Sequence, residues 1–400
     1  MSETQEKLNK QLFNVVADEK VSDEARLKKV KYLVRLGADV TVKDEKGNTV
    51  LMEASKMGRL EMVKYLTEQG GNLDVKDKYG RTALMWAATW GKLDVVKCLV
   101  EHGVDVEAKD KDGQTVLMKV AGCGKLDEVK YLIEQGADLE AKDKYGRTAL
   151  MWAATWGHLE MVKYLTEQGA DLEAKDKDGK TALIKAATSG KLDVVKCLVE
   201  LGADLEASDK YGQTALIEAA SLGKLGVVKC LAELGADLET KDGDGQTALM
   251  MSAYNGHLEV VKYWAECGVD FDAKDGDGRT ALMKAASCGK LDVVKYLTEH
   301  GAVLDVIDKY GKTELMWAAY KGHLEVVKYL AECGADLEAE DEDGQTALDI
   351  ARMWDKDDCV KFLEELQQKG EPNVELLSGK EKNATVRKRG MWQRIFGGRV

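Results

Sequence analysis

The chain has 400 residues, a hydrophobic fraction of 44% and a net charge of −13. Residues 379–400 hold seven Lys or Arg against one Glu, so residues 1–378 carry −19 and are expected to repel nucleic acid and anionic membranes. No apolar run reaches the roughly 18 residues that a membrane span needs, and the polar segment Met1–Lys10 does not resemble a signal peptide. The sequence therefore predicts a cytoplasmic protein, with the nucleus as the alternative.

A period of 33 residues organises the chain. The element Asp-x-x-Gly-x-Thr begins at Asp44, Asp77, Asp110, Asp143, Asp176, Asp209, Asp242, Asp275, Asp308 and Asp341, always with the same interval. Self-similarity at a fixed spacing of this size indicates stacked supersecondary units, each burying its apolar face against its neighbours. We predict eleven units: a cap over residues 1–43, nine full repeats over 44–340 and a second cap over 341–369.

The first cap is expected to contain two helices. Leu8, Leu12, Val15 and Val16 lie at helical spacing, and residues 27–36 supply a second amphipathic stretch. Its ending, Leu36-Gly37-Ala38-Asp39-Val40, matches the ending of the full repeats.

One full repeat shows the expected local structure. Residues 143–146 have turn chemistry, and Thr148 is a good N-cap for a short helix over 149–156. Gly157 ends that helix, and a second helix is predicted from about 158 to 168. A two-turn helix is not stable alone in water, so stacking must hold it. One repeat is irregular, because Gly226 lies inside its predicted second helix.

The C-terminal end departs from the repeat. Residues 361–369 predict a last helix with a polar outer face, and residues 370–400 form a basic tail. Candidate contact residues in the tail are Arg387, Lys388, Arg389, Trp392, Arg394 and Phe396. Four interpretations stay open: an element that lies on a membrane surface, one that docks on a partner, a nuclear-import cluster, or a disordered tail. Membrane contact is expected only through this tail.

The repeat motifs resemble those of the ankyrin-repeat family. The resemblance rests on Gly146-Arg147-Thr148-Ala149-Leu150, Ala153-Ala154, Gly157-His158-Leu159-Glu160 and Gly169-Ala170-Asp171-Leu172, and it covers roughly residues 8–369. It implies an all-α solenoid of helix–turn–helix units with β-hairpin loops at right angles, used as a protein-binding scaffold. The proline usual at the start of the first helix is replaced by alanine in most repeats, by Val50 and Val116, and by Glu314.

Two sets of aromatic residues are candidates for partner binding. The resemblance places them in the concave groove and at the hairpin tips: Trp86, Trp90, Trp152, Trp156, Trp317 and Tyr320 on the first helices, and Tyr79, Tyr145, Tyr211 and Tyr310 at the tips. Tryptophan and tyrosine dominate interface hot spots. The alternative is that these rings pack on their own neighbours, for example Tyr145 against Trp86 or Trp152.

The sequence favours no catalytic, metal or cofactor site. His158, His257 and His323 occupy one repeat position, so they cannot converge on one metal ion. Cys98, Cys197 and Cys230 share a position with tyrosines of other repeats, which indicates packing rather than disulfide pairing. We therefore expect a monomeric, non-catalytic scaffold or adaptor for an unidentified protein partner, and no nucleic acid. A tail-mediated tether and a microbial effector directed at host proteins are the alternatives.

Overall fold

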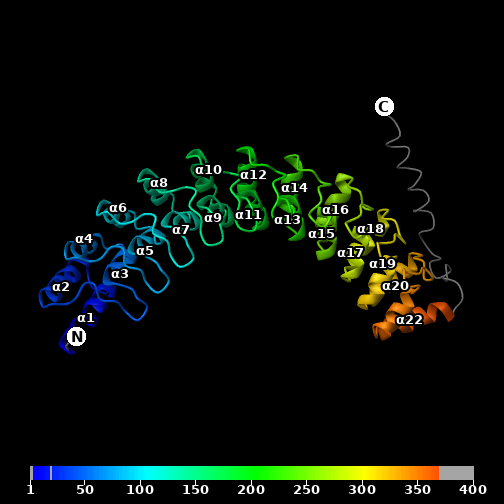
Figure 1. Ribbon diagram of the computed structural model, residues 1–400, viewed down its shortest axis with the longest axis horizontal. Helices are drawn as coiled ribbons and strands as arrows, with labels where there is room; N and C mark the ends of the chain where they lie inside the picture. The colour runs from blue at the N-terminus through cyan, green and yellow to red at the C-terminus, as the bar shows by residue number, and fades with distance from the viewer. Residues whose placement is uncertain (1–2, 19, 369–400) are drawn as a thin grey trace. The chain divides into compact units, whose positions relative to one another are not determined.

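The computed structural model describes residues 3–18 and 20–368. The chain divides into two compact units, Met1–Gly243 and Asp244–Val400, called here the N-terminal and C-terminal units. The described residues form 22 helices, and the predicted all-α fold of repeating helix pairs is confirmed (Figure 1). In this part of the chain no helix is both long and apolar enough to cross a membrane.

The helices of the N-terminal unit alternate between first and second helices of successive pairs. They are α1 (Glu3–Ala17), α2 (Asp23–Arg35), α3 (Val50–Met57), α4 (Leu60–Glu68), α5 (Ala83–Thr89), α6 (Leu93–Glu101), α7 (Val116–Cys123), α8 (Leu126–Glu134), α9 (Ala149–Trp156), α10 (Leu159–Glu167), α11 (Ala182–Thr188), α12 (Leu192–Glu200), α13 (Ala215–Ser221) and α14 (Leu225–Glu233). From α3 to α13 the first helices pack side by side in one row, and the second helices lie in a second row, above the first in Figure 1.

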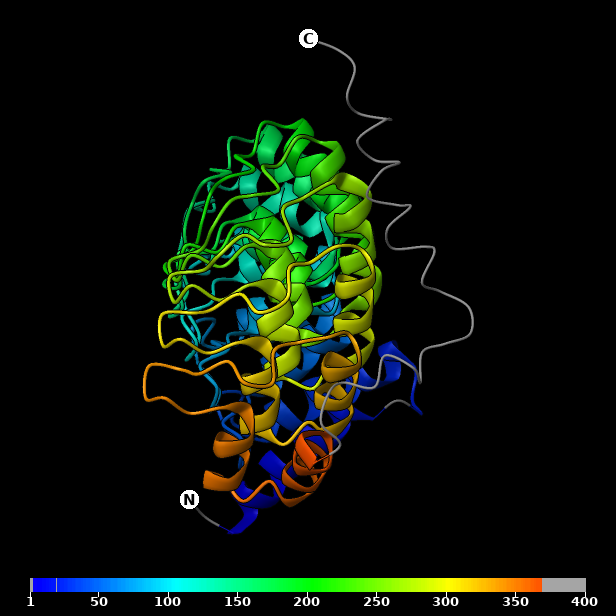
Figure 2. The ribbon, with the colours of Figure 1, turned by 90° about the vertical axis from the view of Figure 1, so that its right-hand side faces the viewer.

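The C-terminal unit repeats the same pairing. Its helices are α15 (Ala248–Asn255), α16 (Leu258–Cys267), α17 (Ala281–Ser287), α18 (Leu291–Glu299), α19 (Glu314–Lys321), α20 (Leu324–Glu332), α21 (Ala347–Met353) and α22 (Asp357–Gln368). Here α22 begins four residues before the predicted start of the last helix. The loops that precede its first helices project to one side of the helices (Figure 2).

The predicted caps of the short helices are confirmed. Thr148 has an extended backbone, and its hydroxyl oxygen accepts a hydrogen bond from the amide of Met151. Gly157 follows with a positive φ of 82° and closes the helix in the left-handed conformation that glycine favours. The second helix covers 159–167, one residue shorter at each end than predicted. The capping threonine and glycine therefore determine the first and last residues of such a short helix.

Close stacking follows from small and aliphatic residues on the first helices. Ala153 and Ala154 are fully buried, and Leu150 is 1% exposed. Alanine lets neighbouring helices approach, and the aliphatic residue beside it fills the space between them. Cys98, Cys197 and Cys230 are buried free thiols that pack as small apolar groups, and desolvation raises their pKa values.

The loops between repeats, called finger loops, join the second helix of one pair to the first helix of the next, as in residues 135–148. Each makes one backbone hydrogen bond to the preceding loop, as from the Lys111 amide to the Tyr79 carbonyl (3.0 Å) and from the Lys144 amide to the Asp112 carbonyl (2.9 Å). Glycine is required at the tip, because a Cβ on Gly80 would lie 2.6 Å from the Lys111 nitrogen. The loops therefore stack as a connected series.

The β-hairpins that the resemblance implies occur as tight turns rather than strands. Among the described residues the bridges are isolated, at Lys43–Thr49 and Ser208–Thr214. The arms of each turn are too short for a ladder, so the Asp77 amide bonds the Arg81 carbonyl (3.0 Å) and the Gly80 amide bonds the Asp77 carbonyl (2.9 Å).

Candidate functional site

The aromatic residues predicted to bind a partner lie in two separate patches, one in each unit. In the N-terminal unit, α5 carries Trp86 and Trp90 follows it, while α9 carries Trp152 and Trp156. Trp90 and Trp156 are 53% and 57% exposed, whereas Trp86 and Trp152 are half-buried. The finger-loop tyrosines of this unit, Tyr79, Tyr145 and Tyr211, are at least half exposed. These residues are the exposed and half-buried aromatic side chains on the first helices and finger loops of residues 77–222.

A guanidinium group joins the finger loop to the first helix. The Arg81 guanidinium carbon lies 4.6 Å from the Tyr79 ring centroid and 4.0 Å from the Trp86 ring centroid. Arg147 is placed in the same way between Tyr145 and Trp152, at 4.7 and 4.0 Å. These are cation–π distances. Arg147 therefore lies between Tyr145 and Trp152, and the Tyr145 ring stays 50% exposed.

A buried aspartate fixes each arginine. The side chain of Asp77 is fully buried, and its Oδ2 accepts a hydrogen bond from Arg81 Nε at 2.8 Å. Its Oδ1 accepts the backbone amides of Tyr79 and Arg81. Asp143 holds Arg147 with the same 2.8 Å contact. The arginines are thus placed by the turn that opens every repeat, so the sandwich is rigid.

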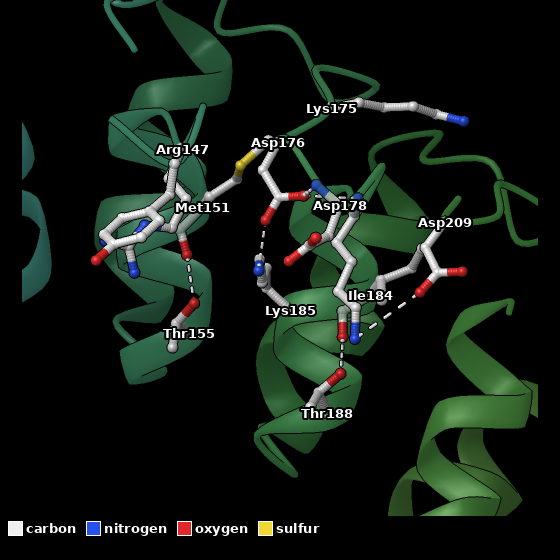
Figure 3. Close-up of polar contacts among 12 residues, drawn as sticks. Arg147, Met151, Thr155, Lys175, Asp176, Asp178, Ile184, Lys185, Thr188 and Asp209 are labelled. Carbon is white, nitrogen blue, oxygen red and sulfur yellow. Dashed lines mark hydrogen bonds and ion pairs between the residues drawn. The ribbon is translucent and has the colours of Figure 1, made fainter. Parts of the chain in front are cut away.

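In two repeats without this arginine, a lysine of the first helix pairs with the repeat aspartate instead. Lys185 Nζ lies 2.6 Å from Asp176 Oδ2, and Lys119 Nζ lies 2.6 Å from Asp110 Oδ2 (Figure 3 shows the Asp176–Lys185 pair). Lys119 and Lys185 occupy the repeat position of Trp86 and Trp152. That position therefore holds an aromatic ring at Trp86 and Trp152 and a cation folded onto the turn at Lys119 and Lys185, whereas other repeats have Glu53, Glu218 or Met251 there.

Ion pairs also link the tips of neighbouring finger loops. Lys144 bonds Asp112, and Lys210 Nζ lies 2.6 Å from Asp178 Oδ1. The hydrogen bond from the lysine is the main cause that lowers the pKa of each aspartate. Because all four side chains are exposed to solvent, these pairs order the tips more than they stabilise the fold.

The tryptophans enclose a hollow that we call the Gly122 socket. Trp86, Trp152 and Trp156 line its sides, Met118, Gly122 and Cys123 line its base, and it is a shallow hollow of about 260 Å³ that is open to solvent. Drug-sized ligands occupy pockets of roughly 300–1,000 Å³, so this volume suits one large side chain. His158 fixes the base, since its Nε2 lies 3.0 Å from the Gly122 carbonyl oxygen.

The C-terminal unit holds the second aromatic patch. Trp317, Tyr320 and Trp354 form a chain of edge-to-face contacts, with centroid distances of 5.8 and 4.8 Å. Trp317 and Tyr320 are half-buried by these contacts, while Trp354 is 50% exposed. Tyr310 on the finger loop is 43% exposed, next to Arg279 of the preceding loop.

The sequence-based candidates lack several residues of these patches, among them Arg81, Arg147, Gly122 and Trp354. The two arginines had a signal, because each stands four residues after a repeat aspartate and five before a tryptophan. Gly122 is recognisable as the one glycine at a position where the neighbouring repeats have threonine. Trp354 lies in the last repeat, where the match to the other repeats weakens.

The predicted tail residues Arg387, Lys388, Arg389, Trp392, Arg394 and Phe396 lie outside the described residues. Within residues 3–18 and 20–368 no group of three His, Cys, Asp or Glu side chains is arranged to hold a metal ion. Two of the repeat histidines instead bridge neighbouring repeats, His158 to Gly122 and His323 to the Ser287 carbonyl at 3.1 Å.

Comparison with known families matches nearly the whole repeat region. The family model described as "Ankyrin repeats (3 copies)" matches residues 21–110, 103–176, 168–242, 236–308 and 303–375. A comparison with curated proteins gives no significant match.

Proposed function

Since the chain belongs to the ankyrin-repeat family, whose repeats are in general protein–protein interaction modules, we propose that it is a non-catalytic scaffold or adaptor. It binds a segment of a partner protein on the face of the N-terminal unit that carries Trp86, Trp90, Trp152 and Trp156. The finger-loop tyrosines Tyr79, Tyr145 and Tyr211 extend this face. Trp317, Tyr320 and Tyr310 form a separate, smaller contact surface in the C-terminal unit.

The exposure of Trp90 and Trp156 is the observation that carries the proposal. Each leaves more than half of its surface in water, although a buried indole contributes a large apolar area. Burying that area against a partner is favourable, and tryptophan loses little rotamer freedom when it is buried. The neighbouring indoles of Trp86 and Trp152 are held in place before binding, because Arg81 and Arg147 stack on them.

The direct test replaces the four tryptophans together by alanine. Proteins captured by the wild-type chain from a lysate are identified, and the purified partner is then titrated against the variant. We expect the variant to lose binding while its far-ultraviolet circular dichroism stays helical.

A matched control removes exposed apolar surface from the second-helix side of the same unit. Tyr32→Ala, Leu192→Ala and Leu201→Ala change residues that are 61%, 42% and 43% exposed. This triple variant should bind the partner like the wild type. If the tryptophan variant binds the partner as tightly as the wild type does, the proposed binding face is wrong.

A further inference from the structure

The Gly122 socket exists because one repeat breaks the pattern of its two neighbours. Gly122 and Cys123 stand where the preceding repeat has Thr89 and Trp90 and the following one has Thr155 and Trp156. Lys119 replaces the half-buried tryptophan, and its side chain, 14% exposed, is folded onto Asp110. The middle helix, α7, packs between the two tryptophan-bearing helices, but its small residues leave a hollow beside the indole rings.

The polar groups around the socket are cationic or neutral. Arg81 and Lys119 are its charged lining residues, with Gln114 and Thr89 beside them, and no Asp or Glu contributes to the lining. Arg81 uses Nε to hold Asp77. Its terminal nitrogens make no hydrogen bond within the described residues, so their N–H groups are available to an acceptor on a partner.

The charge of residues 77–222 follows the same division. The five segments that carry the finger-loop turns and first helices, 77–90, 110–123, 143–156, 176–189 and 209–222, hold ten Lys or Arg against eight Asp or Glu. The four segments between them, 91–109, 124–142, 157–175 and 190–208, hold ten against seventeen. A strongly acidic protein thus presents a slightly positive face around its exposed tryptophans, and such a face favours a negatively charged partner.

We infer that the partner segment is an acidic peptide stretch that inserts one large apolar side chain into the Gly122 socket. This inference rests on the proposed function and specifies the chemistry of the same site. The apolar side chain packs between Trp86 and Trp152, and a carboxylate beside it accepts hydrogen bonds from the free N–H groups of Arg81. Bonds of this kind between guanidinium and carboxylate are among the strong ones in interfaces.

The chain's own tail has the opposite chemistry. Residues 379–400 contain large apolar residues, but their net charge is +6. A basic segment would bring like charge to Arg81 and Lys119, which costs affinity. The tail is therefore a useful negative probe for the socket.

A random-peptide display library selected against the full chain tests the inference without knowledge of the natural partner. The matched variants are Gly122→Met and Gly226→Met. Both glycines are helical and have no positive φ, so methionine raises helix propensity by up to ~1 kcal/mol in each case. A Cβ on Gly122 meets Trp152 and Trp156 at 3.5 Å, an ordinary contact, and the longer side chain fills the socket. Gly226 faces open space on α14.

Enriched peptides should combine Asp or Glu with one Trp, Phe, Leu or Met. Their affinity, measured by fluorescence anisotropy, should fall at least tenfold for Gly122→Met and stay within twofold for Gly226→Met. A synthetic peptide of residues 379–400 should not displace them.

Each other outcome overturns a defined claim. Enriched peptides that are basic, or displacement by the peptide of residues 379–400, would overturn the acidic partner while leaving the binding face intact. Unchanged affinity for Gly122→Met would overturn the socket. If the library enriches no binder, both the inference and the proposed binding face are overturned. Both are also overturned if neither Gly122→Met nor the four-tryptophan replacement changes the affinity of the enriched peptides.

Discussion

The two tryptophan patches use the same residue types in different ways. In the N-terminal unit, Arg81 holds Asp77 of its own turn, and the Trp86 indole N–H is buried without a hydrogen-bond partner. In the C-terminal unit, Trp317 Nε1 donates to Asp308 Oδ2 at 3.0 Å, and its ring is covered by an arginine of the preceding finger loop.

One substitution accounts for this difference. Lys312 stands where Arg81 and Arg147 stand in the other unit, and it pairs with Asp341 of the next repeat. Asp308 Oδ2 then accepts from the indole and, at 3.5 Å, from Arg279 Nε. Arg279 of the preceding finger loop also covers the ring, with its guanidinium carbon 4.6 Å from the Trp317 centroid. In the N-terminal unit the Asp, Arg and Trp side chains in contact therefore come from one repeat. In the C-terminal unit the arginine comes from the preceding repeat.

The consequence for binding is the clearest contrast between the units. The indoles of Trp86, Trp152 and Trp317 are all covered by an arginine, but Trp317 also has an indole hydrogen bond and an aromatic neighbour in Tyr320. Trp86 and Trp152 flank an open socket instead. We therefore expect the N-terminal patch to contribute most of the partner affinity, and four experiments test this comparison from the largest expected effect to the smallest.

The largest effect is expected on binding. The double variant Trp86→Ala/Trp152→Ala should weaken a selected peptide about 100-fold or more, because single hot-spot tryptophans are worth ~2 kcal/mol or more. Trp317→Ala/Trp354→Ala should change the affinity less than twofold. Isothermal titration calorimetry measures both, and a larger loss from the second variant would reverse the comparison.

A buried carboxylate should make the stability of the C-terminal unit depend on pH. Glu314 is 1% exposed, and desolvation by burial raises its pKa to about 7. The folded state therefore holds this proton more tightly than the unfolded chain, and stability falls as the pH rises from about 4.5 to about 7. Above that range the cost is roughly 3 kcal/mol, from a shift of about 2.5 units at 1.36 kcal/mol each.

The measurement is urea unfolding of wild type and Glu314→Gln at pH 4.5 and pH 8. Glutamine keeps an oxygen that accepts the Asp305 amide, which lies 3.1 Å from Glu314 Oε1. The variant should match the wild type at pH 4.5 and be more stable at pH 8. An equal difference at both pH values would show that Glu314 keeps an ordinary pKa. Most repeats have alanine at this position, so no similar dependence is expected in the N-terminal unit.

A smaller gain in stability is expected at Gly226. The residue lies exposed inside α14, and a Cβ added there would meet no other atom within 4 Å, so alanine adds helix propensity without a clash. Gly226→Ala should raise the free energy of unfolding by ~1 kcal/mol. Thermal unfolding followed by circular dichroism measures it, and a lower transition temperature would contradict this account of α14.

The smallest effect is expected from exchanging the arginine. Arg81→Lys gives the N-terminal patch the residue of the C-terminal one, so that Asp77 Oδ2 becomes available to the Trp86 indole. Stability should change little, since one charge-assisted bond is replaced by another hydrogen bond. The Trp86 indole N–H resonance should move toward that of Trp317 in a two-dimensional NMR spectrum. An unmoved resonance would show that Arg81 is not what leaves the indole unpaired.

The sequence was sufficient for the fold because its signals are local and repeated. Thr148 and Gly157 set the limits of α9 to the residue, and the fixed period placed every equivalent helix. The expected β-hairpins are reduced to turns, because the arms beside Gly80 and its equivalents are too short for strand pairing. The resemblance to the family predicted hairpins and did not show that their arms are too short to pair as strands.

The candidate site was predicted only in part, because it depends on contacts between repeats. The sequence located Trp86 and Trp152 but not the hollow between them, which results from what Gly122 and Cys123 lack. It also did not distinguish Trp317 from Trp86, since the identity of Lys312 matters only through its pairing with Asp341 in the next repeat. Residue type was visible in the sequence, whereas the partner of each side chain was not.

The most direct test of the central claim is a crystal structure of the full chain with a selected peptide. The account predicts a large apolar side chain seated over Gly122 between Trp86 and Trp152, with a carboxylate of the peptide on Arg81. A peptide bound to the second helices, or to the C-terminal unit with the Gly122 socket empty, would contradict it.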